Sequence, residues 1–151
     1  RDLVRSRGLG DVYKRQVDRM TKTDYQTQVS RLQALVQRYP GAEVVAESNA
    51  MGQPIIESMQ NAGMAVTGFH TTNQSKQQVI DALSLSFEKG DITIPNDPVL
   101  IAELQAFEST RLASGAMRYS APDGQHDDHV IALSLAWSTR EDDRPLVLMA
   151  A

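Results

Sequence analysis

The sequence predicts an α/β fold with a largely parallel sheet. Short apolar runs bounded by turn residues alternate with longer stretches in which apolar residues recur every three or four positions, the pattern of strands alternating with helices. At 151 residues, the chain is long enough for one domain with a buried core. Its hydrophobic share of 41% and charged share of 23% are those of an ordinary globular protein.

Residues 1–16 differ in character from the rest of the chain. They are basic and show no sustained helical or strand period. Their sequence resembles a translated sequencing adapter, so we expect a non-native leader that plays no part in the fold. A genuine basic arm that contacts DNA is the alternative. If the leader is non-native, the natural chain has been cut upstream of Val17.

In the first half of the chain we expect strands and helices in alternation. In order, these are the end of a strand at 17–20, a helix at 24–39, a buried strand at 42–46, a helix at 54–61 and a strand at 64–69. Asp24 is a typical helix cap, and Pro40-Gly41 stops the first helix. Pro54 near its start and Gly63 just past its end support the second helix.

The second half of the chain continues the alternation. In order, we expect a long helix at 75–89, a short strand at 91–95, a helix at 97–113, the last strand at 116–120, a final helix from Asp127 or Asp128, and a tail at 141–151. Gly90 ends the long helix, and Asp97-Pro98 opens the next one. Val130 and Leu133, three positions apart, belong to the buried face of the final helix.

Composition limits the chemistry that the chain can carry. The absence of cysteine from the sequence excludes disulfides and thiolate metal sites, which leaves carboxylates and histidines that suit magnesium or manganese better than structural zinc. The net charge of −4 argues against a broad basic face, although metal ions can supply positive charge locally. No apolar run is long enough to span a bilayer, so we expect a soluble intracellular protein without a membrane partner.

The most informative stretch is Gly124–Val130, which reads GQHDDHV and leads into an apolar helix. A single Asp at a helix start is explained by capping, because it accepts free backbone N–H groups and opposes the helix dipole. Asp127 and Asp128 are adjacent and flanked by His126 and His129, so they repel each other unless a cation is present. Their spacing alone fits a doubly acidic cap and a metal site equally well.

Glu47 ends a predicted buried strand, where open α/β sheets bind their ligands. Burying such a charge alone is costly, although an ordinary exposed strand-end charge is the alternative. Asn49 and Gly52 indicate a tight turn that lets a ligand approach the backbone. Carboxylates from a strand end and a helix start, such as Glu47 and Asp128, are what two-metal phosphodiester chemistry requires.

A third polar segment, Thr71–Lys76, enters the long predicted helix. Helix N-termini present free N–H groups to phosphate, and Lys76 adds a point charge. A capped turn without a ligand is the alternative. Asn49 and Lys76 are the candidate contacts to nucleic acid.

Five segments in the right order resemble the nuclease domain of tailed-phage terminase large subunits, a ribonuclease H-like domain that cuts concatemeric DNA during packaging. They are Val44–Gly52, Thr72–Lys76, Ile92–Pro95, Glu103-Leu104 and Gly124–Val130. The resemblance runs from about residue 17 to 137. It divides the chain into the leader 1–16, a nuclease domain at 17–140 and the tail 141–151.

The resemblance implies a mixed sheet flanked by helices and a site for two Mg²⁺ or Mn²⁺ ions held by three acidic positions. Two of these positions map to Glu47 and to Asp128, with Asp127 beside it and Asp128 favoured as the principal ligand. His126 would position Asp128 or the scissile phosphate. The family's first acidic ligand lies upstream of the matched segments, so we expect the fold to lack its first strands. The sequence also has no Walker-type motif for the family's motor domain.

The implied activity is endonucleolytic cleavage of double-stranded DNA with little sequence preference, in the host cytoplasm. Implied partners are the portal protein and the small terminase subunit. One alternative is a catalytically incomplete fragment that acts as a structural or protein-binding module. Another is a different ribonuclease H-like nuclease of the resolvase or integrase type.

Overall fold

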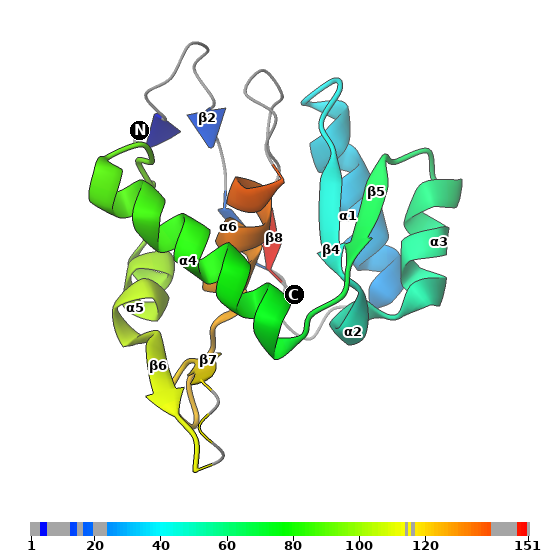
Figure 1. The fold of residues 1–151 in the computed structure, drawn as a ribbon. Helices are drawn as coiled ribbons and strands as arrows, with labels where there is room; N and C mark the ends of the chain where they lie inside the picture. The colour runs from blue at the N-terminus through cyan, green and yellow to red at the C-terminus, as the bar shows by residue number, and fades with distance from the viewer. Residues whose placement is uncertain are drawn as a thin grey trace.

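The structure is a computed structural model that describes residues 4–5, 13–14, 17–19, 24–113, 115, 117–139 and 148–150. Helices and short strands alternate along most of this length (Figure 1). The elements are β1 (Val4–Arg5), β2 (Tyr13–Lys14), β3 (Val17–Arg19), α1 (Tyr25–Gln37), β4 (Val44–Glu47), α2 (Ser48–Met51), α3 (Gln53–Asn61), β5 (Val66–Phe69), α4 (Asn73–Lys89), α5 (Pro98–Ala106), β6 (Glu108–Arg111), β7 (Met117–Ser120), α6 (Asp128–Ser138) and β8 (Leu148–Ala150).

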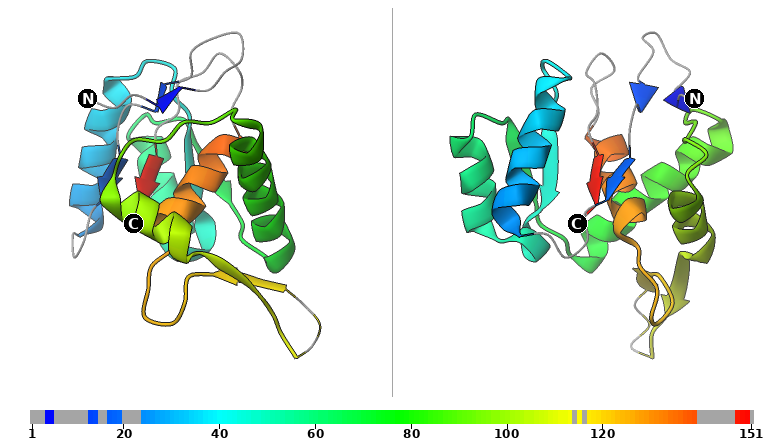
Figure 2. Two further views of the ribbon diagram at one scale, coloured as in Figure 1. Left: turned by 90° about the vertical axis from the view of Figure 1, so that its left-hand side faces the viewer. Right: turned by 180° about the vertical axis from the view of Figure 1, so that it is seen from behind.

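The parallel pair β4–β5 lies between two layers of helices (Figures 1 and 2). Successive side chains of a strand point to opposite faces. On one face, Val44 and Ala46 pack with residues of α1 and α3, including Leu32 and Met59. On the other face, Val45 packs with a cluster formed by α4 and α6. The strand pair is therefore covered on both faces, as expected for a buried parallel arrangement.

A second core joins the three helices on the far side of β4. Leu83 of α4, Leu100 of α5 and Leu133 of α6 are all buried and in one cluster. Leu100 has no exposed surface. This packing fixes α4 and α5 relative to the start of α6.

The other described strands also pair two by two. β3 and β8 are parallel, with Val17 opposite Leu148, and β8 packs against α6 (Figure 2). β6 and β7 form an antiparallel hairpin that projects from the helices, and β1 pairs antiparallel with β2. Parallel and antiparallel pairs thus occur together, which confirms the α/β class with mixed pairing. The described strands form four separate pairs, two of them antiparallel, so the expectation of a largely parallel sheet is wrong.

Most expected elements form where the sequence places them. Asp24 caps α1 by accepting the N–H of Thr27 at 3.0 Å, and Gly90 ends α4 in the left-handed conformation. The long helix begins two residues earlier than expected, at Asn73, because Thr72 and Ser75 form a capping box. The short helix α2 has no counterpart among the expected elements. The leader 1–16 and the tail 141–151 lie largely outside the described residues, and their status stays a prediction.

The strand predicted at 91–95 is wrong, since this segment has no regular secondary structure. Local hydrogen bonds hold its ends: the N–H of Asp91 bonds the carbonyl of Ser86, and the N–H of Asp97 bonds that of Pro95. Ile92 and Ile94 nevertheless pack against the cluster of α4, α5 and α6. Alternating burial therefore occurs here without a strand.

The helix predicted at 97–113 is too long, because α5 ends at Ala106. Phe107 is extended, with φ −67° and ψ 128°, and the next residues pair as β6 with β7. The strand at 117–120 is present but is not the last, since β8 comes after α6. Strand pairing decided both outcomes, with the next strand of a hairpin in the first case and with the distant β3 in the second, and local propensity does not report such pairing.

No helix in the described part of the chain is long and apolar enough to cross a membrane.

Candidate active site

The candidate residues lie on elements that meet at one end of the β4–β5 pair. Both strands run in the same direction, and their carboxyl ends lie beside the N-terminal ends of α4 and α6, in the lower part of Figure 1. Carboxyl ends of parallel strands and N-terminal ends of helices are the usual ligand-binding edge of α/β folds.

Glu47 lies on the side of β4 that faces α4 and α6. Its neighbour two positions earlier, Val45, packs against Val79 of α4 and Ile131 of α6. Because residues two apart in a strand share a face, the Glu47 side chain leaves β4 on the same side. Glu47 is half-buried and is the residue from which α2 begins. The fold therefore places this carboxylate on the side where Asp127 and Asp128 start α6.

Asp127 forms an ion pair with Lys76. Its Oδ2 lies 3.0 Å from the Lys76 Nζ, and the two side chains are only 26% and 20% exposed. Asp127 is the N-cap residue of α6, yet within the described chain its carboxylate makes no capping hydrogen bond. The ammonium also lies 5.8 Å from the centre of the Phe107 ring. Simple helix capping thus does not explain Asp127.

Asp128 is the first residue of α6 and is 36% exposed. Its Oδ2 lies 3.9 Å from Nδ1 of His126, too far for a hydrogen bond but close enough for attraction to a protonated imidazole. His126 is 68% exposed and lies at the outer side of the site. Both side chains remain accessible to an incoming phosphate or cation.

Asn49 ties the end of β4 to the loop that enters α4. Its amide nitrogen donates to the Thr71 carbonyl at 2.9 Å, and its amide oxygen accepts the Thr71 N–H at 3.0 Å. Gly52 closes the same turn with φ +77°, a conformation that favours glycine. Asn49 thus fixes the position at which α4 begins, and with it the position of Lys76. Its predicted contact with nucleic acid stays a prediction.

The sequence does not indicate as site residues a buried, hydrogen-bonded pair behind the site, Glu103 and His129. Glu103 of α5 accepts the backbone N–H of His129 at 2.8 Å through Oε2 and lies 2.8 Å from the His129 Nδ1 through Oε1. The side chains are 7% and 4% exposed. A signal is present, since Glu103 falls at helical spacing between Leu100 and Phe107 on an apolar helix face.

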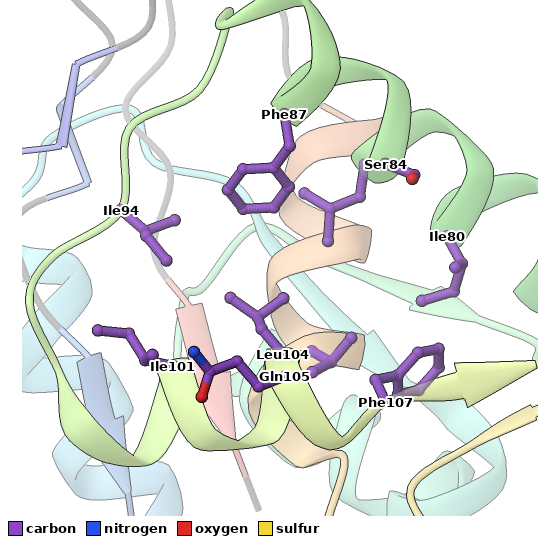
Figure 3. A pocket seen from close by; sticks show the side chains of 10 residues that line it. Ile80, Ser84, Phe87, Ile94, Ile101, Leu104, Gln105 and Phe107 are labelled. Atoms are coloured by element: carbon purple, nitrogen blue, oxygen red, sulfur yellow. The ribbon is translucent and has the colours of Figure 1, made fainter.

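An apolar cavity of about 430 Å³ lies between α4, α5 and the segment that precedes α5 (Figure 3). Uncharged side chains line it: Ile80, Leu83, Ser84, Phe87, Ile94, Ile101, Leu104, Gln105, Phe107 and Val130. Such a lining does not suit a metal or phosphate. Phe107 lies between this cavity and the acidic site, since its ring also contacts the Lys76 ammonium.

The described residues include no group of three or more histidine, cysteine or acidic side chains that could hold a metal ion. Glu47, Asp127 and Asp128 supply oxygen ligands of the kind that magnesium and manganese prefer. Lys76 at Asp127 shows that this carboxylate accepts a cation in the folded chain. The residues present therefore fit part of a divalent-metal site.

The fold is that of a ribonuclease H-like nuclease domain. The family model described as "Terminase RNaseH-like domain" matches residues 5–140, so the chain belongs to the terminase ribonuclease H-like family. The large terminase subunits of Thermus phage G20c and Thermus virus P23-45 are each 37% identical over 126 residues. The match covers 83% of this chain and 26% of each relative, so the chain spans about a quarter of their length.

Solved structures agree with this assignment. The large terminase nuclease of thermophilic phage G20c superposes with a TM-score of 0.75 at 36% identity, over 81% of this chain and 66% of that one. The nuclease domain of Thermus phage P74-26 gives a TM-score of 0.72 at 34% identity, over 85% and 67%. The G20c nuclease has also been solved with bound magnesium, where the TM-score is 0.74 at 36% identity over 81% and 65%. That relative therefore binds a divalent metal.

Proposed function

We propose that this chain forms part of a metal-dependent endonuclease that cuts concatemeric double-stranded DNA during phage genome packaging. The observation that carries the proposal is membership of the terminase ribonuclease H-like family, and it is supported by Glu47 at the end of β4 and by Asp127 and Asp128 at the start of α6. We further propose Mg²⁺ or Mn²⁺ as the cofactor, with two ions in the complete site, by analogy with the magnesium-bound relative.

Glu47 and Asp128 would hold the metal ions, and Asp127 would share in this through the oxygen that Lys76 leaves free. When bound, the ions would activate the attacking water and neutralise charge on the phosphate in the transition state. Lys76 offsets part of the negative charge of the aspartate pair, which allows two carboxylates to sit side by side.

The backbone and the outer side chains would position the DNA. The positive ends of the α4 and α6 dipoles would attract a phosphate at this edge of the fold. His126, the most exposed member of the site, would contact the phosphate or orient Asp128. Contacts of this kind do not read base edges, so we expect little sequence preference. We place this activity in the host cytoplasm, with the portal protein and small terminase subunit as partners.

Plasmid cleavage in manganese tests the proposal. The solved nuclease domains are longer than the part that this chain matches, so the assay uses both this chain and a version extended upstream to their length. We expect cleavage of supercoiled plasmid that stops in Glu47→Gln and Asp128→Asn and in excess chelator. Exposed acids of the same types, changed as Glu57→Gln and Asp81→Asn, serve as matched controls and should leave cleavage intact.

Two results would contradict the proposal. Cleavage that survives in both Glu47→Gln and Asp128→Asn would place the chemistry elsewhere. If neither version of the chain cuts DNA or binds manganese, the chain is a structural or protein-binding module, and the aspartate pair only shapes the start of α6.

A further inference from the structure

We infer that Glu103 is a positioning residue for the acidic site: it caps α6 from a neighbouring helix and thereby lets Asp127 bind a cation instead of capping the helix. This inference rests on the proposed function, since it gives the aspartate pair a role in metal binding. Glu103 itself is 6% exposed and lies behind the site, on α5.

The start of α6 has an unusual capping arrangement. The first N–H groups of a helix have no partner within the helix, and the N-cap side chain normally accepts one of them. Asp127 holds that position but turns its carboxylate to Lys76, 3.0 Å away. The N–H of His129, the second residue of α6, is instead accepted by Oε2 of Glu103 at 2.8 Å. Glu103 therefore performs the task that Asp127 would otherwise perform.

The second oxygen of Glu103 fixes the His129 ring. With Glu103 as a carboxylate, which only accepts hydrogen bonds, the contact of 2.8 Å to Nδ1 assigns a proton to that nitrogen. The backbone and the ring of His129 are thus held by one side chain, and both partners are buried. Because His129 directly follows Asp128, these two contacts fix the backbone from which both aspartates project.

Burial gives the arrangement its importance. A carboxylate removed from water is tolerated only when it is paired and hydrogen-bonded, and removing one partner leaves the other buried without a partner. In Glu103→Ala, the N–H of His129 would need a new acceptor, and the nearest chemically suitable group is the N-cap side chain of Asp127. Asp127 would then turn away from Lys76 and from the site. Loss of Glu103 should therefore weaken metal binding.

Titration with Mn²⁺ alone tests this role, with binding followed by the electron paramagnetic resonance signal of free manganese. We expect Glu103→Ala to lower the affinity by about tenfold or more, the range found for residues that orient metal ligands. Glu103→Gln keeps an acceptor for the His129 N–H and should retain an affinity within about threefold of the parent. Leu32→Ala, a buried residue of α1 on the other face of β4, is the control for general destabilisation.

Nitrogen-15 NMR of His129 gives a readout that destabilisation alone would not change. The parent should carry its proton on Nδ1. In Glu103→Gln the side-chain amide would donate to Nδ1, so the proton should move to Nε2 while the fold, checked by circular dichroism, is unchanged.

The outcomes separate the inference from the function on which it rests. If Leu32→Ala loses as much manganese affinity as Glu103→Ala, or if Glu103→Ala binds as well as the parent, Glu103 is only structural and the inference is wrong. A parent chain that itself binds no manganese would overturn the proposed metal site, and the positioning role with it.

Discussion

Lys76 shares the acidic site with any metal ion that binds there. Its ammonium is 3.0 Å from Asp127, so it lowers the negative potential that attracts a divalent cation. We expect Lys76→Met, which keeps the apolar stem beside Phe107, to bind Mn²⁺ about fivefold more tightly, since two charges 4 Å apart in water interact by ~1 kcal/mol. DNA affinity of the same variant should fall. Calorimetric titration measures the first effect and fluorescence anisotropy the second.

Lys89, exposed at the opposite end of α4, provides the control for Lys76. Lys89→Met removes the same charge far from Asp127 and should leave the manganese affinity unchanged. Equal effects of the two substitutions would show that only net charge matters and that Lys76 has no special place in the site.

Asp24 makes a pH-dependent contribution at the start of α1. The N–H of Thr27, and then its hydroxyl, lower the pKa of this carboxyl from its usual value by hydrogen bonding to the charged form. Because the folded pKa is the lower one, the stabilisation is present above the unfolded pKa and disappears as pH falls through the folded pKa. We expect Asp24→Asn, which still caps but does not titrate, to lose less thermal stability than the parent below about pH 4. If Tm falls by the same amount in the two proteins as the pH is lowered, this argument is wrong.

At the scale of elements, β5 approaches α3 closely at Gly68. A Cβ at this position would lie 3.0 Å from Cδ1 of Ile56. We expect Gly68→Ala to lower the free energy of unfolding by about 1–3 kcal/mol through overpacking. Urea denaturation measures this, and Ile56→Val removes the atom in question. The double variant should be more stable than the sum of the single effects predicts, and strict additivity would show that the contact is not limiting.

Much of the element order follows from local signals, and the errors have a common cause. The cap at Asp24, the stop at Gly90 and the apolar face of α6 are encoded within a few residues, so the sequence is sufficient there. The strand expected at 91–95 and the overlong helix from 97 depend instead on strand pairing: no described strand pairs with 91–95, whereas residues 108–111 pair with β7. A period in the sequence reports burial, and it does not report which neighbour provides it.

The same distinction applies to the site. Strand-end and helix-start positions can be read from the sequence, which is why Glu47 and Asp128 are candidates on sequence alone. The partner of Asp127 cannot be read from the sequence, since Lys76 is 51 residues away and meets Asp127 only through the packing of α4 on α6. Glu103 requires the same knowledge, because its acceptor role depends on where α5 crosses the start of α6.

For the whole molecule, metal binding should be coupled to stability. A ligand that binds only the folded state stabilises it by about 2.7 kcal/mol at a free concentration of one hundred times Kd. For a chain of this size, that corresponds to a rise in Tm of about 5–10 °C. We expect Mn²⁺ to produce such a rise, chelator to reverse it, and Asp128→Asn to abolish it. Calorimetric scans at fixed protein concentration provide the measurement, and an equal rise in Asp128→Asn would point to binding elsewhere.

The net negative charge of the chain should make its binding to DNA depend on bound metal ions. With a net charge of −4, the molecule as a whole repels a polyanion, and the candidate site adds three carboxylates to that repulsion. Binding of duplex DNA should therefore be weak in chelator and rise with Mn²⁺, because bound ions reverse the sign of charge at the site. Anisotropy titrations at low and high salt, with Asp128→Asn as the control, measure this dependence. Tight binding in chelator that also persists in Asp128→Asn would assign DNA contact to another surface and separate DNA binding from the acidic site.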